Sequence, residues 1–206
     1  MYYLTVANEM YPHPPMPDGA RAGILRGCYK LALPPAADDW PPIHLFASGA
    51  IVREALRAQQ LLADRQVGAH VWSATSFTEL RRDALAVQRW NMLHPLEPRR
   101  QSYLASVLAA EPYPIVAASD YMKSVADQIA PFVPAGLWAL GTDGFGRSDD
   151  RGPLRRFFEV DAECITVAAL SALAQRGQMD PASVAHAIRD FAIDPERLNP
   201  AEANCQ

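Results

Sequence analysis

The chain has 206 residues, half of them hydrophobic and a fifth charged, which is typical of a folded globular protein with one sizeable core. Its 19 Lys and Arg residues against 23 Asp and Glu residues give a net charge of −4, so the composition offers no electrostatic reason to expect a nucleic-acid partner, whose binders carry a basic patch or stripe. Three cysteines at long spacings argue against a disulfide framework or a zinc site and fit a reducing compartment.

No targeting segment or membrane span is expected. The longest nearly apolar run, residues 165–174, is too short to cross a bilayer, which needs about 20 residues. The N-terminus lacks a basic region followed by an apolar stretch. We therefore expect a cytoplasmic protein with no membrane partner.

The first part of the chain combines short elements with proline-rich connections. Residues 2–6 are rich in β-branched and aromatic side chains and predict a strand. Because an edge strand needs a neighbour, a strand this early indicates that the chain starts inside a larger fold. A loop (8–18), a short helix (19–26) and a second strand (28–33) follow. Residues 34–42 hold two Pro-Pro pairs, which helix and sheet interiors do not tolerate, and predict a linker.

From residue 43 onward, strand and helix patterns alternate. Strands are predicted at 44–48, 69–74, 113–118 and 136–141, and helices at 50–65, 76–90, 102–110, 120–132, 154–158, 161–176 and 180–191. Such alternation is typical of an α/β fold with a mostly parallel sheet and helices on both faces.

Capping residues support several of these helix boundaries. Ser76 and Glu79 form a capping box, in which each side chain accepts from the other residue's backbone N–H. Asp120 and Asp180 are predicted N-caps, the latter followed by a proline in the first turn, and Gly177 is a fitting C-cap.

A glycine-rich loop follows the last predicted strand. Three glycines in six positions let the backbone take positive φ values and approach a neighbour closely. The loop supplies the candidate site residues Asp143, Gly144, Phe145, Gly146, Arg147, Ser148 and Asp149. It can bind an anion through backbone N–H groups or serve as a structural or interface loop. We favour the interface, because Asp143, Asp149 and Asp150 would repel a phosphate and Arg147 offsets only one of them.

The familiar catalytic motifs are absent from the sequence. No two histidines lie three or four residues apart, so no metal site is expected, and there is no nucleophile elbow, Walker loop or dinucleotide fingerprint. Cys164 sits in an apolar helix pattern and is interpreted as a buried small hydrophobe rather than a reactive thiol. His94 is interpreted as a cap of the preceding helix, with an acid or base role as the alternative.

Several segments together resemble one family. These segments, which occur in a fixed order, are 2–6, 16–19, 73–80, 89–95, 119–123 and 140–149 followed by 158–162. They resemble the C-terminal part of the homodimeric bacterial type of pyruvate dehydrogenase, and the resemblance runs from about Tyr2 to Asn199. The runs 89–94 and 140–149 are the most specific.

The resemblance implies a division of the chain and a role for it. It implies the end of a pyrimidine-binding-type domain (1–33), the linker (34–42), a transketolase-like C-terminal domain with a mixed five-stranded sheet (43–199) and a frayed tail (200–206). In this family the two preceding domains hold thiamine diphosphate, a divalent metal such as magnesium and the catalytic residues. The family's Gly-Asp-Gly cofactor motif does not occur here, so no catalytic, cofactor-binding or metal-binding residue is assigned to this chain.

The resemblance also implies partners. These are the preceding domains of the same enzyme, a second copy in a homodimer and the dihydrolipoyl acetyltransferase component, whose lipoyl group the whole enzyme acetylates after decarboxylating pyruvate. Alone, the chain is expected to be inactive and to act through packing and dimer support. The alternative is a stand-alone module that binds a small ligand or anion at the 141–149 loop; a hydrolase has no motif behind it.

Overall fold

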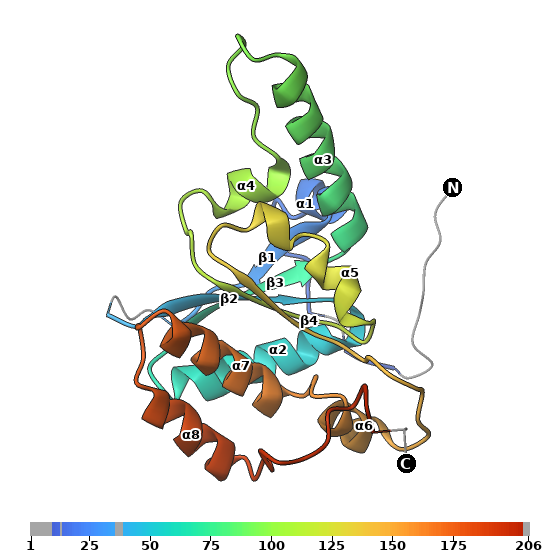
Figure 1. Cartoon of the computed structure of the whole chain (residues 1–206), viewed down its shortest axis with the longest axis vertical. Coiled ribbons are helices and arrows are strands. Elements are labelled where there is room, and N and C mark those ends of the chain that lie inside the picture. Colours follow the sequence, from blue (N-terminus) through green and yellow to red (C-terminus); the bar gives the residue numbers. More distant parts are fainter. Residues whose placement is uncertain (1–9, 13, 36–38, 204–206) are drawn as a thin grey trace.

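The computed structural model describes residues 10–12, 14–35 and 39–203, and the strand expected at 2–6 lies outside them. A five-stranded sheet in the order β1-β3-β2-β4-β5 forms the centre, with α1, α3, α4 and α5 on one face and α2, α7 and α8 on the other (Figure 1). The expected α/β class, with a mixed and mostly parallel sheet covered on both faces, is confirmed.

The elements follow the predicted order along the chain. The strands are β1 (Cys28–Ala32), β2 (Pro42–Ala47), β3 (Gly68–Ala74), β4 (Ile115–Ala118) and β5 (Leu137–Leu140). The helices are α1 (Arg21–Arg26), α2 (Val52–Ala63), α3 (Phe77–Leu93), α4 (Tyr103–Leu108), α5 (Lys123–Asp127), α6 (Arg151–Phe157), α7 (Ala162–Gln175) and α8 (Pro181–Asp190), with 3-10 turns η1 (Gly49–Ile51) and η2 (Ala130–Phe132). None of the helices in the described part of the chain combines the length and apolar character needed to cross a membrane.

The first strand joins the same sheet as the later ones. β1 pairs antiparallel with β3, whereas β2 pairs in parallel with both β3 and β4, and β4 in parallel with β5. The expected domain boundary at residue 33 therefore falls between two strands of one sheet. The prolines mark a change in chain direction between β1 and β2. Pro42, expected in the linker, is the first residue of β2, where a missing N–H is tolerated.

The sheet divides the core into two layers. Successive residues of a strand point to opposite faces, so Leu45 and Val71 pack on the α2 and α7 side while Phe46 and Trp72 pack on the α3 and α4 side. β2, β3 and β4 are almost wholly buried, which explains why their sequences are continuous apolar runs instead of alternating ones.

Helix α3 begins as its sequence predicts. The Ser76 hydroxyl accepts from the Glu79 N–H at 3.1 Å. The reciprocal half of the capping box is replaced, because the Ser76 N–H donates to Gly27 O at 3.0 Å and the Glu79 carboxylate pairs with Arg82. The helix runs to Leu93, where His94 Nδ1 donates to Trp90 O at 2.8 Å and confirms the capping role of His94.

Removing the Ser76 cap is expected to destabilise the folded chain modestly. Ser76→Ala should lower the free energy of unfolding by about 1 kcal/mol, because one N-terminal N–H of α3 loses its acceptor. Urea unfolding followed by circular dichroism measures the loss. The matched control is Ser124→Ala in α5, an exposed serine, which should leave the midpoint nearly unchanged. Equal effects of the two changes would contradict the capping argument.

The helix expected at 120–132 is broken and starts later. The structure has α5 at Lys123–Asp127, then η2 at Ala130–Phe132 with Pro131 in it, and Asp120 is not the N-cap. The Thr142 N–H donates to Tyr121 O at 2.9 Å, which holds the preceding segment extended, and Asp143 Oδ1 accepts from the Lys123 N–H at 3.0 Å. The cap of α5 thus comes from the glycine loop, about 20 residues away in sequence, and Pro131 interrupts the helix because it has no N–H to donate.

Candidate functional site

The main candidate site lies at the carboxyl ends of three parallel strands. β2, β4 and β5 lead there into residues 48–51, 119–122 and 141–149. The chain runs from β2 to β3 on one side and then crosses to β4 on the other, so the strand order reverses between β2 and β4. In open α/β sheets, ligands commonly bind in the crevice outside such a reversal.

A cavity of about 260 Å³ opens at this edge. Its apolar wall is formed by Ile51, Leu154, Phe158 and Val160, of which Ile51, Phe158 and Val160 are buried. Its polar and charged lining residues are Asp120, Thr142, Arg147, Arg151 and Arg155. The cavity therefore combines a hydrophobic wall with a mainly basic rim.

The predicted loop residues divide between this cavity and the loop's own support. Phe145, Gly146 and Arg147 line the cavity, and Phe145 is 70% exposed. Asp143 does not line it, because its carboxylate caps α5, and Asp149 Oδ1 accepts from the Asp150 N–H at 2.7 Å. Gly144 and Ser148 lie on the exposed side of the loop without lining the cavity.

The three glycines have three different positions in the packing. A Cβ at Gly141 would lie 2.5 Å from Tyr121 O and 2.7 Å from the Lys123 nitrogen, so the backbones approach too closely for a side chain. Gly144 has φ +97°, a region that favours glycine. Gly146 has open space around its Cβ position. Close approach and positive φ, both expected from the sequence, occur together at Gly144, where a Cβ would lie 2.8 Å from Pro200 O, whereas Gly141 shows close approach alone.

Arginines from the loop and α6 are held beside the cavity. The Arg147 guanidinium carbon lies 4.6 Å from the centre of the Phe157 ring, and Arg147 Nη2 donates to Ala203 O at 3.2 Å. Arg151 and Arg155 are four residues apart on α6 and so share one face of it. The segment 199–203, partly expected as a frayed tail, forms hydrogen-bonded turns against the loop, and residues 204–206 lie outside the described chain.

Glu54 of α2 connects α6 and α7 from within. Its side chain is 8% exposed and lies 2.9 Å from Arg155 and 3.1 Å from Arg57. The same carboxylate accepts from the Ala162 N–H at the start of α7, at 3.2 Å. One buried carboxylate therefore holds both Arg155 of the cavity and the first turn of α7.

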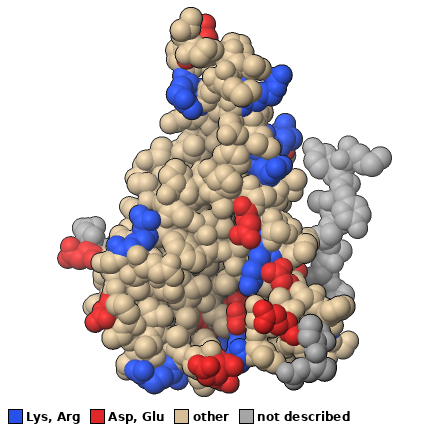
Figure 2. Space-filling model, in the orientation of Figure 1, with Lys and Arg blue, Asp and Glu red and all other residues tan. Residues whose placement is uncertain are grey.

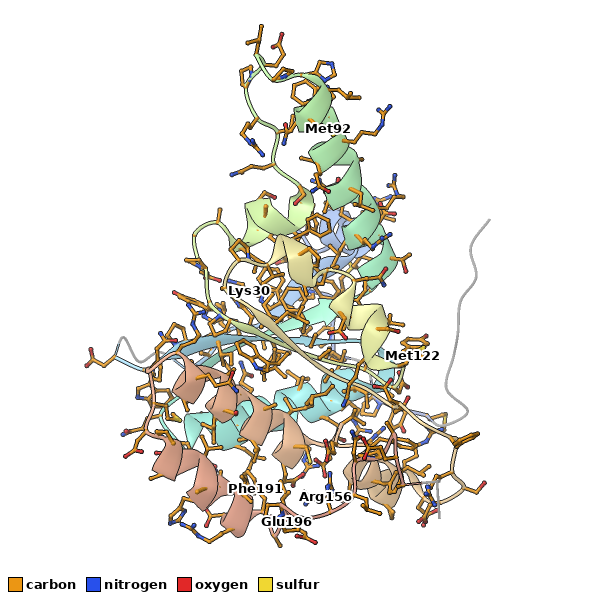
Figure 3. The ribbon with its side chains drawn as sticks, in the orientation of Figure 1. Lys30, Met92, Met122, Arg156, Phe191 and Glu196 are labelled. Atoms are coloured by element: carbon orange, nitrogen blue, oxygen red, sulfur yellow. The ribbon has the colours of Figure 1, made fainter. Side chains whose placement is uncertain are left out.

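A second cluster, missed from the sequence, lies deeper in the molecule. His44, His70 and Glu111 bring possible ligand atoms within 4.8 Å of one another. His44 and His70 are register partners on β2 and β3. Lys30 of β1, which Figure 3 labels, pairs with the Glu111 carboxylate. These residues are far apart in sequence, so the spacing rules for metal ligands give no signal, and only strand pairing joins them.

The hydrogen bonds of this cluster do not suit a metal ion. Trp72 Nε1 donates to His44 Nδ1 at 3.0 Å, so His44 carries its proton on Nε2 and donates it to Glu111 O at 2.9 Å. A metal at Nε2 would move that proton to Nδ1, opposite the indole N–H. Lys30 already neutralises the carboxylate. The cluster is therefore a partly buried polar network that joins β1, β2, β3 and the segment before β4.

Burial of this network makes the chain sensitive to acid. Desolvation lowers the pKa of His44 to about 4, despite the raising effect of its hydrogen bond to the Glu111 carbonyl. Because the folded-state pKa lies below the unfolded value of about 6.5, this contribution to stability is present above pH 6.5 and is lost as the pH falls towards 4.

The urea midpoint of the unmodified chain should fall between pH 6.5 and 4. The fall should be less steep in the His44→Gln variant, which lacks the buried imidazole. Urea titrations across this range measure it. His186→Gln, which removes an exposed histidine of α8, is the control and should keep most of the original slope. Parallel slopes for His44→Gln and the unmodified chain would refute this assignment.

Cys164 is buried, as its sequence context predicts. It is 7% exposed, and desolvation raises the pKa of its thiol to about 12. The thiol therefore stays protonated at neutral pH and is a poor nucleophile.

Comparison with known proteins adds a family relationship. Residues 27–161 match the family described as the transketolase-like TK C-terminal domain. The chain is 49% identical over 203 residues to the pyruvate dehydrogenase E1 component of Pseudomonas aeruginosa, covering 98% of this chain and 23% of that protein. It is 49% identical over 201 residues to the E1 component of Escherichia coli K12, covering 97% and 22%.

Solved structures agree in fold. Transketolase from Leishmania mexicana matches with a TM-score of 0.50 and 21% identity, over 75% of this chain and 19% of that one. Transketolase from Pichia stipitis matches with a TM-score of 0.50 and 22% identity, over 76% and 19%. The chain thus spans less than a quarter of the length of the curated relatives described above.

Proposed function

Because the chain belongs to the transketolase-like TK C-terminal domain family, we propose that it is the C-terminal domain of a pyruvate dehydrogenase E1 component. The observation that carries this proposal is 49% identity to such components along 98% of the chain. In the proposed whole enzyme, which acts in the cytoplasm, pyruvate is decarboxylated and a lipoyl group of the dihydrolipoyl acetyltransferase component is reductively acetylated.

In this proposal the domain contributes structure and not chemistry. In the proposed enzyme, other domains hold thiamine diphosphate and magnesium, and neither of the two sites described above suits the metal. Magnesium takes oxygen ligands, whereas the cavity at the 141–149 loop offers one carboxylate, Asp120, among three arginines. In the His44–His70–Glu111 cluster, Lys30 pairs with the Glu111 carboxylate and Trp72 donates to His44 Nδ1.

A projecting arm supports a packing role. Helix α3 and the loop after it extend away from the sheet, with basic side chains along the visible face of the arm (Figures 1 and 2). At its outer end, Met92 is 69% exposed and Leu96 98% exposed. Asn91 exchanges two hydrogen bonds with the Arg100 backbone, at 2.9 and 3.0 Å, which holds the arm in shape. A stiff arm with an apolar tip is suited to burial against another domain or a second subunit of a homodimer.

The first test is activity with and without the rest of the enzyme. The 206-residue chain, given thiamine diphosphate, magnesium and pyruvate, should produce no carbon dioxide. A hybrid in which this chain replaces the matching 201 residues of the E. coli E1 component should decarboxylate pyruvate. Turnover by the chain alone, or a folded hybrid with no activity, would contradict the proposal.

The arm gives a second test, directed at dimer support. Leu96→Asp in the hybrid should weaken the dimer in sedimentation experiments, because a carboxylate would replace an exposed apolar side chain in the proposed interface. In the isolated chain the same change should leave the melting temperature unchanged, since the side chain is 98% exposed. If the Leu96→Asp hybrid dimer were as stable as the unmodified hybrid dimer, the arm would not lie in the dimer interface.

A small-ligand site at the glycine loop is the second candidate function. It is favoured by the cavity that Phe145, Gly146 and Arg147 line at the reversal of strand order. This role is compatible with the first, because it uses a different surface from the arm.

A further inference from the structure

We propose that the cavity between the 141–149 loop and α6 binds a small organic anion, a phosphate or carboxylate group on a compact apolar body. The site does not depend on the chain's place in a pyruvate dehydrogenase. Its volume of about 260 Å³ is just below the range usual for drug-sized ligands, which sets the size of the ligand.

The electrostatic objection raised by the sequence disappears in the folded chain. Three carboxylates of the loop region seemed set to repel an anion, but Asp143 caps α5 and Asp149 bonds the backbone of Asp150. None of Asp143, Asp149 and Asp150 lines the cavity. These carboxylates therefore do not contact the space where a ligand would sit.

Three arginines and one carboxylate line the cavity. Arg155 is paired with Glu54, and Arg147 and Arg151 lie in the lining together with Asp120. Both arginines also take part in interactions within the chain. Each guanidinium has five N–H donors in a planar fork, so it can keep an internal partner and still receive an anion.

The apolar part of the site defines the rest of the ligand. Ile51 and Val160 are each 1% exposed and form the wall opposite the charged rim, while the Phe145 ring at the mouth is 70% exposed. A bare inorganic ion would leave the exposed Phe145 ring in contact with water. A ligand with a flat apolar body covers this ring and places its anionic group on the arginines.

The Thr142 hydroxyl already has a partner and so limits the choice of ligand. It donates to Asp120 O at 2.9 Å, which fixes the loop to the segment after β4. Its oxygen remains able to accept one hydrogen bond from a ligand. Recognition of the charge therefore rests on the arginines.

The test uses the purified 206-residue chain and calorimetric titration with phenyl phosphate, benzoate, inorganic phosphate and phenol. Phenyl phosphate or benzoate should bind more tightly than either fragment probe, inorganic phosphate or phenol. Arg147→Gln and Arg151→Gln should each weaken binding of the organic anion by about tenfold. Phe145→Ala should weaken the binding of the organic anion but not the binding of inorganic phosphate. The control is Arg82→Gln on α3, where the exposed guanidinium is paired with Glu79. This substitution should leave the affinity for every probe unchanged.

Four outcomes decide the matter. Loss of affinity for the organic anion in Arg147→Gln and Arg151→Gln, but not in Arg82→Gln, supports the proposal. Whichever of phenyl phosphate and benzoate binds more tightly identifies the preferred anionic group. Equal affinity for phenyl phosphate and inorganic phosphate, equal losses in Arg82→Gln, or no heat from either organic anion at millimolar concentration would each overturn it. Arg147 and Phe145 are exposed, so their variants remain informative if Arg151→Gln does not fold, as circular dichroism would show.

Discussion

Glu54→Ala is expected to lower the free energy of unfolding by about 4 kcal/mol, the largest single effect among the changes considered. Removing one partner of a buried ion pair leaves the other charge desolvated without compensation, which commonly costs about 3–5 kcal/mol. Glu54 is 8% exposed and Arg155 16% exposed, so water does not replace the lost partner. The Ala162 N–H at the start of α7 loses its acceptor in the same change.

Matched variants separate these contributions. Glu54→Gln keeps an oxygen for the Ala162 N–H but removes the charge. Its free energy of unfolding should lie between that of the unmodified chain and that of Glu54→Ala. Arg57→Ala removes the outer partner, 60% exposed, and should cost less than about 1 kcal/mol. In a double-mutant cycle, Glu54→Ala with Arg155→Ala should cost less than the sum of the single changes.

Urea unfolding of each variant gives the free energies. A loss below about 1 kcal/mol for Glu54→Ala would show that the carboxylate is a surface group in solution.

Gly141→Ala should destabilise the chain by about 2–3 kcal/mol through overpacking. The added Cβ would lie 2.5 Å from Tyr121 O and 2.7 Å from the Lys123 nitrogen, both backbone atoms. Relief requires the strand end to move away from the segment before α5. That movement would break the bond from the Thr142 N–H to Tyr121 O, and the cap that Asp143 provides to Lys123.

Gly146→Ala in the same loop is the control. Its Cβ position has no atom within 4 Å, and its φ lies outside the region that favours glycine. The substitution should change stability by less than about 0.5 kcal/mol. Similar melting temperatures for the Gly141 and Gly146 variants would mean that the loop moves freely away from α5.

Local features of the sequence predicted most of the elements. Helices α3, α7 and α8 begin at Ser76, Asp161 and Asp180, where a side-chain oxygen accepts from a backbone N–H two or three residues later. Such contacts involve neighbours in the chain, so the residue pattern is sufficient to locate them. The alternation of strand and helix patterns after residue 43 likewise predicted a mostly parallel sheet covered by helices.

Long-range contacts were beyond the same reasoning. The shortened α5 follows from Asp143 and Thr142, and the membership of β1 in the sheet follows from its pairing with β3 across the linker. Neither contact leaves a periodic signal, because each depends on which distant segments meet in space.

The amino-acid sequence alone therefore determined the α/β class, the order of strands and helices, and the family resemblance, since these rest on periodicity, caps and ordered motifs. Only the tertiary structure decided where charges point. It placed the Asp143 carboxylate at the start of α5 and brought His44, His70 and Glu111 together. The physical reason is that side-chain orientation and strand register are set by packing between segments remote in sequence, and electrostatic energy depends on those final distances.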